Sequence, residues 1–404
     1  MTKRTARRYI ERTLSVPKLI KLIPQELLEN LANDTHVDYQ VKYLHGALMF
    51  KLFLFSILKS ERLSTRIMEL FYNSTEFNVF SEKGGHTTKH SSIADRLRTI
   101  DNNYFEKIFE AVGGLLEKRF RNKNKKVMDL LRFDSTMVSI GAKLVNYGMQ
   151  VGKKASKGSG KKQIKFTIGL KGMLPSDVHL FTNHAQLSED VALREAIIKS
   201  SHTADSIVVF DRGLQKRLAL AEFDSSGINF VTRANDYIKY EQIEVHKQIL
   251  GRKTDTLEFD QDILVYLFDH YNKKIDFPFR LVKAKSKQSG EPILFLTNIK
   301  HLNASEISEI YHRRWDIEVF FRFIKQELNF SNLVSYNENG TKVMMYMVLI
   351  TAMLLLAYKK ANNIEGYKIA KLKFTDELQM EITKEIVVFC GGDPKKMKLI
   401  YNPN

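Results

Sequence analysis

The sequence predicts an α/β domain with a helical region on either side of it in the chain. Residues 1–125 place apolar side chains at helical spacing, and strand-like alternation is scarce there. From Val127 onward, short apolar runs that end in turn residues alternate with helical stretches, which is typical of a sheet covered by helices. Helical periodicity then returns at the end of the chain. These observations divide the chain into a helical domain at 1–125, an α/β domain at 126–341 and a helical region at 342–404.

The balance of charge indicates a polyanionic partner. The chain has 404 residues, with 63 Lys and Arg against 46 Asp and Glu, a formal net charge of +17 and a pI near 9.5. Such an excess often accompanies nucleic-acid binding, although a basic protein without such a partner is the simpler alternative. We therefore expect residues 1–125 to form a DNA-binding domain, followed by a charged linker at 118–127.

Two features bear on where the protein works. Cys390 is the single cysteine, so neither an intrachain disulfide nor a zinc site built on cysteines is available. The longest apolar run, Val343–Tyr358, is shorter than the roughly 20 residues that cross a bilayer, and it predicts a buried core helix. The first residues lack the apolar core of a signal peptide. A soluble, cytoplasmic protein is expected.

The α/β domain begins with three expected strands. Residues 127–133 form a short apolar run that ends at Asp134, and residues 162–172 and 177–184 alternate as strands do. The Leu-Pro-Ser-Asp stretch at 174–177 predicts the turn between the last two of them.

The next expected strand, residues 206–210, ends at Asp211 in the same way. Helical periodicity precedes it at 189–201 and follows it at 215–223, before a further strand at 228–234. This alternation of strands and helices predicts one sheet with helices packed on it.

Two further segments complete the α/β domain. Residues 237–297 read as polar, strand-like runs and predict a β-rich insertion. Residues 303–328 predict one long helix, in which Asn303 and Glu306 have the spacing of a capping box.

One face of that helix carries an unusual set of side chains. At roughly 100° per residue, six polar or aromatic residues share a stripe between apolar sectors. They are Tyr311, Arg314, Trp315, Glu318, Arg322 and Lys325. A salt-bridge ladder in which Glu318 pairs with the arginines four residues before and after it is the simpler alternative. That ladder contains too few acidic residues to pair with all of the basic ones. A nucleic acid would supply phosphates for the basic residues and a base on which Trp315 could stack.

Asp134 and Asp211 each follow an expected strand, where the edge of a sheet would hold them rigidly. Each alone could be an ordinary turn or capping residue. Together with Glu318 they form a set of three carboxylates, which are the oxygen ligands that hard divalent cations require.

The order Asp134, Asp211, Glu318 resembles that of the DDE transposases, which have a ribonuclease-H-like catalytic core. One group of bacterial insertion sequences carries Asp-x-Thr at the first acid and Asp-Arg-Gly at the second. The same contexts stand here as Asp134-Ser135-Thr136 and Asp211-Arg212-Gly213.

That group is also defined by a Tyr-Arg-Glu-Lys signature. Its spacing matches Tyr311-x2-Arg314-x3-Glu318-x6-Lys325 in this chain. The resemblance covers about residues 130–330, and the group carries a β-strand insertion between its second Asp and its Glu. The expected fold is thus a ribonuclease-H-like core with a β-rich insertion.

The resemblance implies a transposase that cuts its element out of DNA and inserts it elsewhere. Asp134, Asp211 and Glu318 would be the catalytic residues and would bind two Mg²⁺ or Mn²⁺ ions. The DNA-binding residues would be Tyr311, Arg314 and Lys325, with Trp315 stacking on a flipped base at a hairpin end. The helical stripe itself adds Arg322 as a further phosphate contact.

The expected partners are the terminal inverted repeats and the target DNA, bound by a homodimer in the bacterial nucleoid. Two other functions stay open: a DNA-binding regulator that has lost catalysis, and a ribonuclease-H-like nuclease. The three acids favour an enzyme over a regulator, and the basic signature favours a transposase over a nuclease. The loop at 152–165 is either a phosphate contact or a solvated connection; it is not a P-loop, because Gly160-Lys161 is followed by Lys162.

Overall fold

In the computed structural model, residues 14–120, 129–139, 149–151, 161–247, 254–334 and 337–397 are described. Most of the expected linker at 118–127 and of the loop at 152–165 lies outside them. The chain divides into two compact units. The helical unit comprises Met1–Arg121, Ser139–Tyr147 and Arg322–Asn404, and the sheet unit comprises Asn122–Val138 and Gly148–Phe321.

The helical unit joins helices from both ends of the chain. Its α-helices are α2 (Val16–Ile20), α3 (Gln25–Thr35), α4 (Gly46–Lys59), α5 (Thr65–Tyr72), α6 (Thr75–Ser81), α7 (His90–Thr99), α8 (Asn102–Phe120), α13 (Glu338–Ala361) and α14 (Tyr367–Phe389). Short 3-10 turns occupy η4 (Phe330–Asn332) and η5 (Pro394–Met397).

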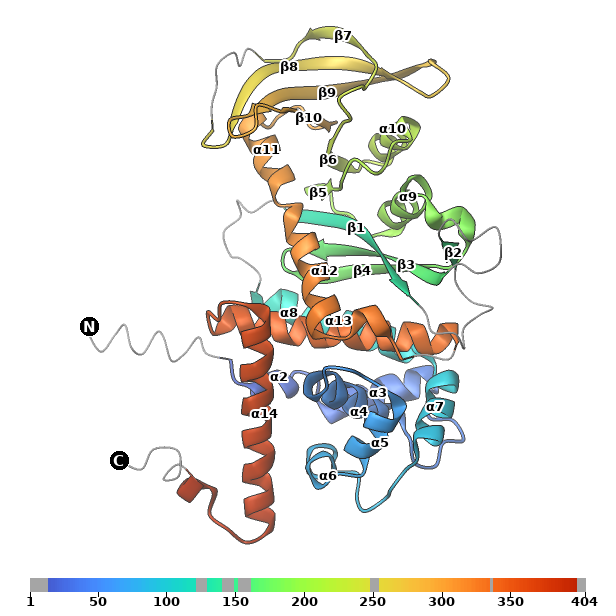
Figure 1. Cartoon of the computed structure of the whole chain (residues 1–404), viewed down its shortest axis with the longest axis vertical. Helices are drawn as coiled ribbons and strands as arrows, with labels where there is room; N and C mark the ends of the chain where they lie inside the picture. The colour runs from blue at the N-terminus through green and yellow to red at the C-terminus, as the bar shows by residue number, and fades with distance from the viewer. Residues whose placement is uncertain are drawn as a thin grey trace, which may run out of the picture. The chain divides into compact units, whose positions relative to one another are not determined.

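Helix α13 is the centre of this unit. It packs against α4, α7, α8 and α14, and Figure 1 shows α8 running alongside it. By length and composition α13 could cross a membrane, but 94% of its most apolar window is buried inside the protein. The prediction of a buried core helix is confirmed. A helix that is apolar on every side must be covered on every side, which explains why elements from both chain ends surround it.

The sheet unit contains one mixed sheet. Its strands, in the described residues, follow the order β2-β3-β1-β5-β6-β10-β9-β8-β7, with β4 paired to β3. Their bounds are β1 (Asp129–Ser139), β2 (Met149–Val151), β3 (Lys161–Lys171), β4 (Leu174–Phe181), β5 (Ser206–Val209), β6 (Asn229–Arg233), β7 (Tyr240–Val245), β8 (Leu257–Phe268), β9 (Lys274–Ser286) and β10 (Pro292–Thr297). β5 is parallel to both β1 and β6, whereas β6 to β10 pair antiparallel along the order.

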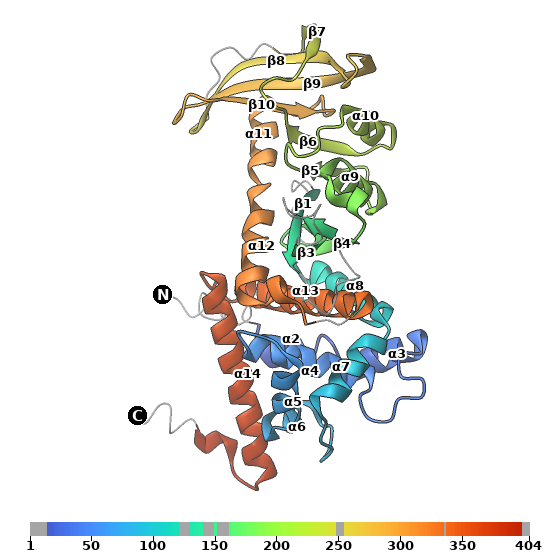
Figure 2. The same ribbon diagram turned by 45° about the vertical axis from the view of Figure 1, so that its right-hand side comes forward.

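Each face of the sheet has its own core, because successive strand residues point to opposite sides. Val208 belongs to the cluster beneath α9 (Glu189–Lys199) and α10 (Arg217–Ser225). Its neighbours Ile207 and Val209 belong to the cluster that includes α11 (Ala304–His312). Figure 2 shows α9 and α10 on one side of the strands and α11 on the other. The prediction of an α/β fold with a large sheet is confirmed.

Two local predictions are wrong. Asp134 does not end its strand, because β1 continues to Ser139. The stretch at 174–177 is not a turn but the start of β4; the chain reverses one step earlier, where Gly172 has a φ of 62°. Pro175 fits in a strand here because β4 lies at the sheet edge and the pairing with β3 shifts register beside it.

The single helix expected over 303–328 is two helices, α11 and α12 (Trp315–Glu327). The capping box is present as predicted: the Asn303 side chain accepts from the Glu306 amide, and the Glu306 carboxylate accepts from the Asn303 amide. At the junction the amide of Arg314 bonds to the carbonyl of Tyr311, so a tight turn replaces regular helix. A spacing argument from sequence cannot detect such a turn, because both arms keep helical periodicity.

Candidate active site

Two aspartates meet where β1 and β5 run side by side. The parallel register pairs Arg132 with Val209, and two more residues along each chain lead to Asp134 and Asp211. Asp134 accepts a hydrogen bond from the amide of the next residue at 2.7 Å, and Asp211 accepts one from Gly213 at 2.8 Å. The backbone therefore orients both carboxylates.

Asp134 lies in a region that disfavours negative charge. Burial raises the pKa of the Asp134 carboxyl to about 7, and repulsion from Asp211 and Glu189 acts in the same direction. Attraction to Arg314 and the amide hydrogen bond oppose this rise. Arg314 therefore compensates the burial of this carboxylate only in part, and a divalent cation would stabilise its charged form further.

Gly213 has a steric reason for being glycine. A Cβ at this position would lie 2.8 Å from an oxygen of Asp211 and 3.2 Å from the side chain of Glu189. Any larger residue would push one of these carboxylates away. The Asp-Arg-Gly context noted in the sequence therefore has a packing role beside the second aspartate.

The junction between α11 and α12 brings three residues of the stripe together. Arg314 donates to Glu318 at 2.5 Å, and its guanidinium lies 5.7 Å from the centre of the Tyr311 ring. Burial raises the pKa of Tyr311. Burial alone would lower the pKa of Arg314, but Tyr311, Glu318 and Asp134 outweigh it and raise that pKa. Arg314 is thus electrostatically linked to the first aspartate while it is bonded to the glutamate.

Glu318 pairs with Arg314 in this structure, which is one of the two ion pairs that the salt-bridge alternative supposed. Among the described residues, no three His, Cys, Asp or Glu side chains are grouped closely enough to hold a metal ion. The partly buried aspartate pair fits a cation by its charge. Glu318 would join it only after leaving Arg314.

The other residues named from the sequence lie along α12. Trp315 is 52% exposed at its first position. Arg322 is exposed, and Lys325 is partly buried in the last turn. Arg322 and Lys325 belong to the helical unit, whereas Trp315 belongs to the sheet unit.

Sequence reasoning missed two buried cations near the aspartates. Arg132, two residues before Asp134, is 1% exposed; it pairs with Asp316 at 3.1 Å and donates to the carbonyl of Gly172. Lys165 on β3 is 3% exposed and pairs with Glu189 at 2.7 Å. The available signal was a basic residue inside an apolar strand, which a buried ion pair explains.

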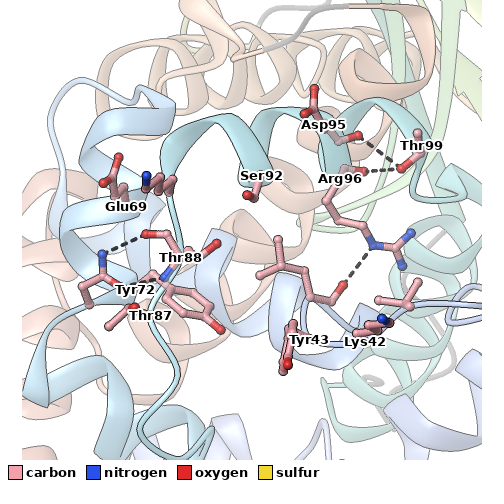
Figure 3. Close-up of a pocket in the computed structure, with 14 residues that line it drawn as sticks. Lys42, Tyr43, Glu69, Tyr72, Thr87, Thr88, Ser92, Asp95, Arg96 and Thr99 are labelled. Atoms are coloured by element: carbon pink, nitrogen blue, oxygen red, sulfur yellow. Dashed lines mark hydrogen bonds between the residues drawn. The ribbon is translucent and has the colours of Figure 1, made fainter.

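The described residues include two sizeable cavities. The larger, of about 710 Å³, lies in the helical unit; Figure 3 shows Arg96 at its wall, where it donates to the Leu44 carbonyl at 2.9 Å. One of its two acids, Glu69, already accepts from the amide and ring of His90. The smaller, of about 500 Å³, lies in the sheet unit beside the second aspartate, and its lining includes, besides the acids Asp190 and Asp269, several basic side chains. These are Arg212, Lys216, Arg217 and Arg233.

Comparisons with known proteins agree on one family. The family described as "Transposase DDE domain" matches residues 125–354, more than half of the chain. A Synechocystis sp. protein named as a transposase for insertion sequence element IS4SA is 25% identical over 67% of this chain and 72% of its own length. A Sinorhizobium fredii protein named as transposase y4zB is 24% identical over 74% of this chain and 76% of its own.

A solved structure supports the same fold. The piggyBac transposase, in a synaptic complex with hairpin DNA, superposes with a TM-score of 0.50 at 14% identity. The alignment covers 96% of this chain and 84% of that one. The chain belongs to the transposase DDE domain family, and it is a DDE transposase of the insertion-sequence kind, an enzyme that cuts and joins DNA strands with the help of divalent metal.

Proposed function

We propose that this chain moves an insertion sequence by phosphoryl transfer at Asp134, Asp211 and Glu318. The observation that carries this proposal is the parallel register of β1 and β5, which sets two partly buried carboxylates next to each other. Two strands of one sheet form a rigid frame, and metal-assisted displacement at phosphorus requires such a frame.

The three acids would hold two Mg²⁺ or Mn²⁺ ions. Bound ions activate a water or a 3′-hydroxyl as the nucleophile and stabilise the leaving oxygen. Asp134 and Asp211 would contribute the fixed ligands, since backbone amides already orient them. Glu318 would contribute the adjustable ligand, because its present partner is the side chain of Arg314.

A DNA phosphate would make Glu318 available. The guanidinium of Arg314 binds phosphate in the same forked geometry in which it binds a carboxylate. When DNA arrives, Arg314 turns to the phosphate and releases Glu318 toward the aspartates. Tyr311, which packs under that guanidinium, would guide the exchange and bind phosphate beside it.

Further DNA contacts would lie on α12. In the Tyr-Arg-Glu-Lys signature, Lys325 binds phosphate together with Tyr311 and Arg314, and Arg322 adds a contact one turn after Glu318. Trp315, more than half exposed, would stack on a base turned out of the duplex. The piggyBac complex contains hairpin DNA, which supports a hairpin intermediate here.

The remaining parts receive roles in the same scheme. The core is ribonuclease-H-like, and the strands at 237–297 form its β-rich insertion. The basic helical domain at 1–125 recognises the terminal inverted repeats. The catalytic domain at 126–341 follows it in the chain, and the helical region at 342–404 comes last. The protein acts as a homodimer on paired ends and target DNA, in the cytoplasm at the nucleoid.

The test uses purified protein, the terminal inverted repeats of the element and Mg²⁺. Wild type is compared with Asp134→Ala and with Asp129→Ala, a control on the same strand whose carboxylate pairs with Lys171 at 3.3 Å. We expect cleavage at the repeat ends by wild type and control, and none by Asp134→Ala. Unspecific nicking would identify a nuclease instead, and binding without cleavage would identify a regulator.

A further inference from the structure

The first turn of α9 contacts both segments that carry the aspartates. Ser188 caps the helix by accepting from the amide of Asp190. The next two residues, Glu189 and Asp190, direct their carboxylates to groups outside α9. The proposed function does not use either residue.

Glu189 connects α9 to β1 and β3. One oxygen of its carboxylate accepts from the hydroxyl of Ser135 at 2.8 Å, and the other accepts from Lys165 at 2.7 Å. The amide of Ser135 is the donor that orients Asp134. The Ser135 hydroxyl also lies 2.8 Å from that of Thr167 on β3. Through Ser135, Glu189 therefore acts on the first aspartate.

Asp190 connects the same turn to the loop after β5. One of its oxygens accepts from the amides of Gln215 and Lys216, each at 2.6 Å. Asp211 is the second residue of this loop, because β5 ends at Val209. Two amides on one oxygen hold a loop in a single conformation, so Asp190 restrains the segment that follows the second aspartate.

Gly213 lies between the two connections. The absence of a side chain there lets Glu189 approach the Asp211 segment, since a Cβ would lie 3.2 Å from the Glu189 chain. The first turn of α9 thus touches the Asp134 side and the Asp211 side at once.

Helix stabilisation alone does not explain this arrangement. Acidic residues in a first turn favour the helix dipole wherever they point. The need to neutralise buried Lys165 explains why one oxygen of Glu189 bonds to it. It explains neither the hydrogen bond from Ser135 to the other oxygen nor the two amide hydrogen bonds to Asp190.

We propose that Glu189 and Asp190 are positioning residues that hold the two aspartate segments at the spacing a divalent cation needs. The inference rests on the proposed function, because it assumes that Asp134 and Asp211 bind the metal. Groups that orient metal ligands typically change metal affinity or activity by about 10- to 100-fold when they are removed.

The experiment measures Mn²⁺ affinity of the DNA-free protein by calorimetry and the Mn²⁺ concentration for half-maximal end cleavage. The variants are Glu189→Ala, Asp190→Ala and Asp190→Asn. The control is Glu195→Ala, on the same helix, whose carboxylate pairs with Lys199 at 3.5 Å. Thermal unfolding establishes that each variant is folded.

We expect both alanine variants to need about 10- to 100-fold more Mn²⁺ in the two measurements, at melting temperatures near that of the control. Asp190→Asn keeps the accepting oxygen and should return to the wild-type requirement, which a general loss of stability would not produce. A folded alanine variant whose Mn²⁺ requirement equals that of the control overturns the proposal for that residue.

Glu189→Ala could lose its fold, since it leaves Lys165 buried without this carboxylate. The pair Lys165→Met and Glu189→Leu removes both charges and keeps apolar volume, a change that proteins often tolerate. Its Mn²⁺ requirement then decides the matter by the same criterion. The proposed function fails separately, if wild type binds no Mn²⁺ or if Asp134→Ala cleaves like wild type.

Discussion

Two groups of buried charge in the sheet unit are built on opposite principles. On β8 and β9, Asp262 and Arg280 are both completely buried and bond through two contacts, at 2.8 and 2.7 Å. The remaining nitrogen of Arg280 donates to the carbonyls of Ile299 and Leu302. Every charge in this group is neutralised within the protein.

Beside β1 and β5 the balance is different. Arg314 bonds directly to Glu318 and also attracts Asp134, which Asp211 repels. The Nε of Arg314 makes no hydrogen bond. Burying unneutralised charge costs free energy, and proteins avoid it where nothing is to be gained. Under the proposed function a bound cation would complete the charge here, whereas the balance at Asp262 is that of a structural pair.

The largest effect is expected on catalysis. If Asp211 is a metal ligand as proposed, Asp211→Asn should lower the rate of end cleavage by at least about 1,000-fold with little change in stability. Single-turnover cleavage and thermal unfolding measure the two quantities. Asp129→Asn is the matched control, and comparable rates for the two variants would remove Asp211 from the reaction.

At the pair of Asp262 and Arg280, a substitution should lower the stability of the fold instead of the cleavage rate. Asp262→Ala leaves Arg280 buried without its carboxylate and should lower the free energy of unfolding by about 3–5 kcal/mol, as measured by urea denaturation. The double change Asp262→Leu with Arg280→Met removes both charges and should cost much less. An equal loss in the single and double variants would contradict a charge origin.

Asp134→Asn, unlike Asp262→Ala, should stabilise the metal-free protein at high pH. The folded-state pKa of about 7 lies above the ordinary value of 3.8, so ionisation weakens the wild-type fold as the pH rises between these values. Above pH 7 the variant should be more stable by up to about 4 kcal/mol, and at pH 4 the difference should vanish.

Melting temperatures from pH 4 to 8 in the presence of EDTA check this prediction, with Asp129→Asn as control. Added Mg²⁺ should stabilise wild type at pH 8 more than it stabilises Asp134→Asn. A constant difference across the whole pH range would show that the carboxyl group is not the cause.

The smallest effect concerns the exchange of partners at Glu318. Arg314→Ala frees this carboxylate and should tighten Mn²⁺ binding to DNA-free protein by about two- to fivefold, the typical value of a partly exposed ion pair. Binding to the repeat ends should weaken in the same variant. Tighter DNA binding, or weaker Mn²⁺ binding, would argue against a competition between Glu318 and phosphate for Arg314.

The sequence by itself determined the features that depend on local pattern. The α/β character, the capping box of Asn303 and Glu306 and the buried helix at 343–358 follow from periodicity and turn chemistry, which a few neighbouring residues encode. The family was also readable, because the contexts of Asp134 and Asp211 are short and contiguous. The catalytic roles of these residues stay predictions.

Only the tertiary structure decided how distant segments meet. Two ion pairs join residues on separate elements: Arg132 with Asp316, and Lys165 with Glu189. The periodicity of a sequence does not predict such partners. The same holds for α13, whose apolar surface required helices from both chain ends. Local patterns specify which element forms, whereas the need to bury apolar surface and to neutralise buried charge selects which elements come together.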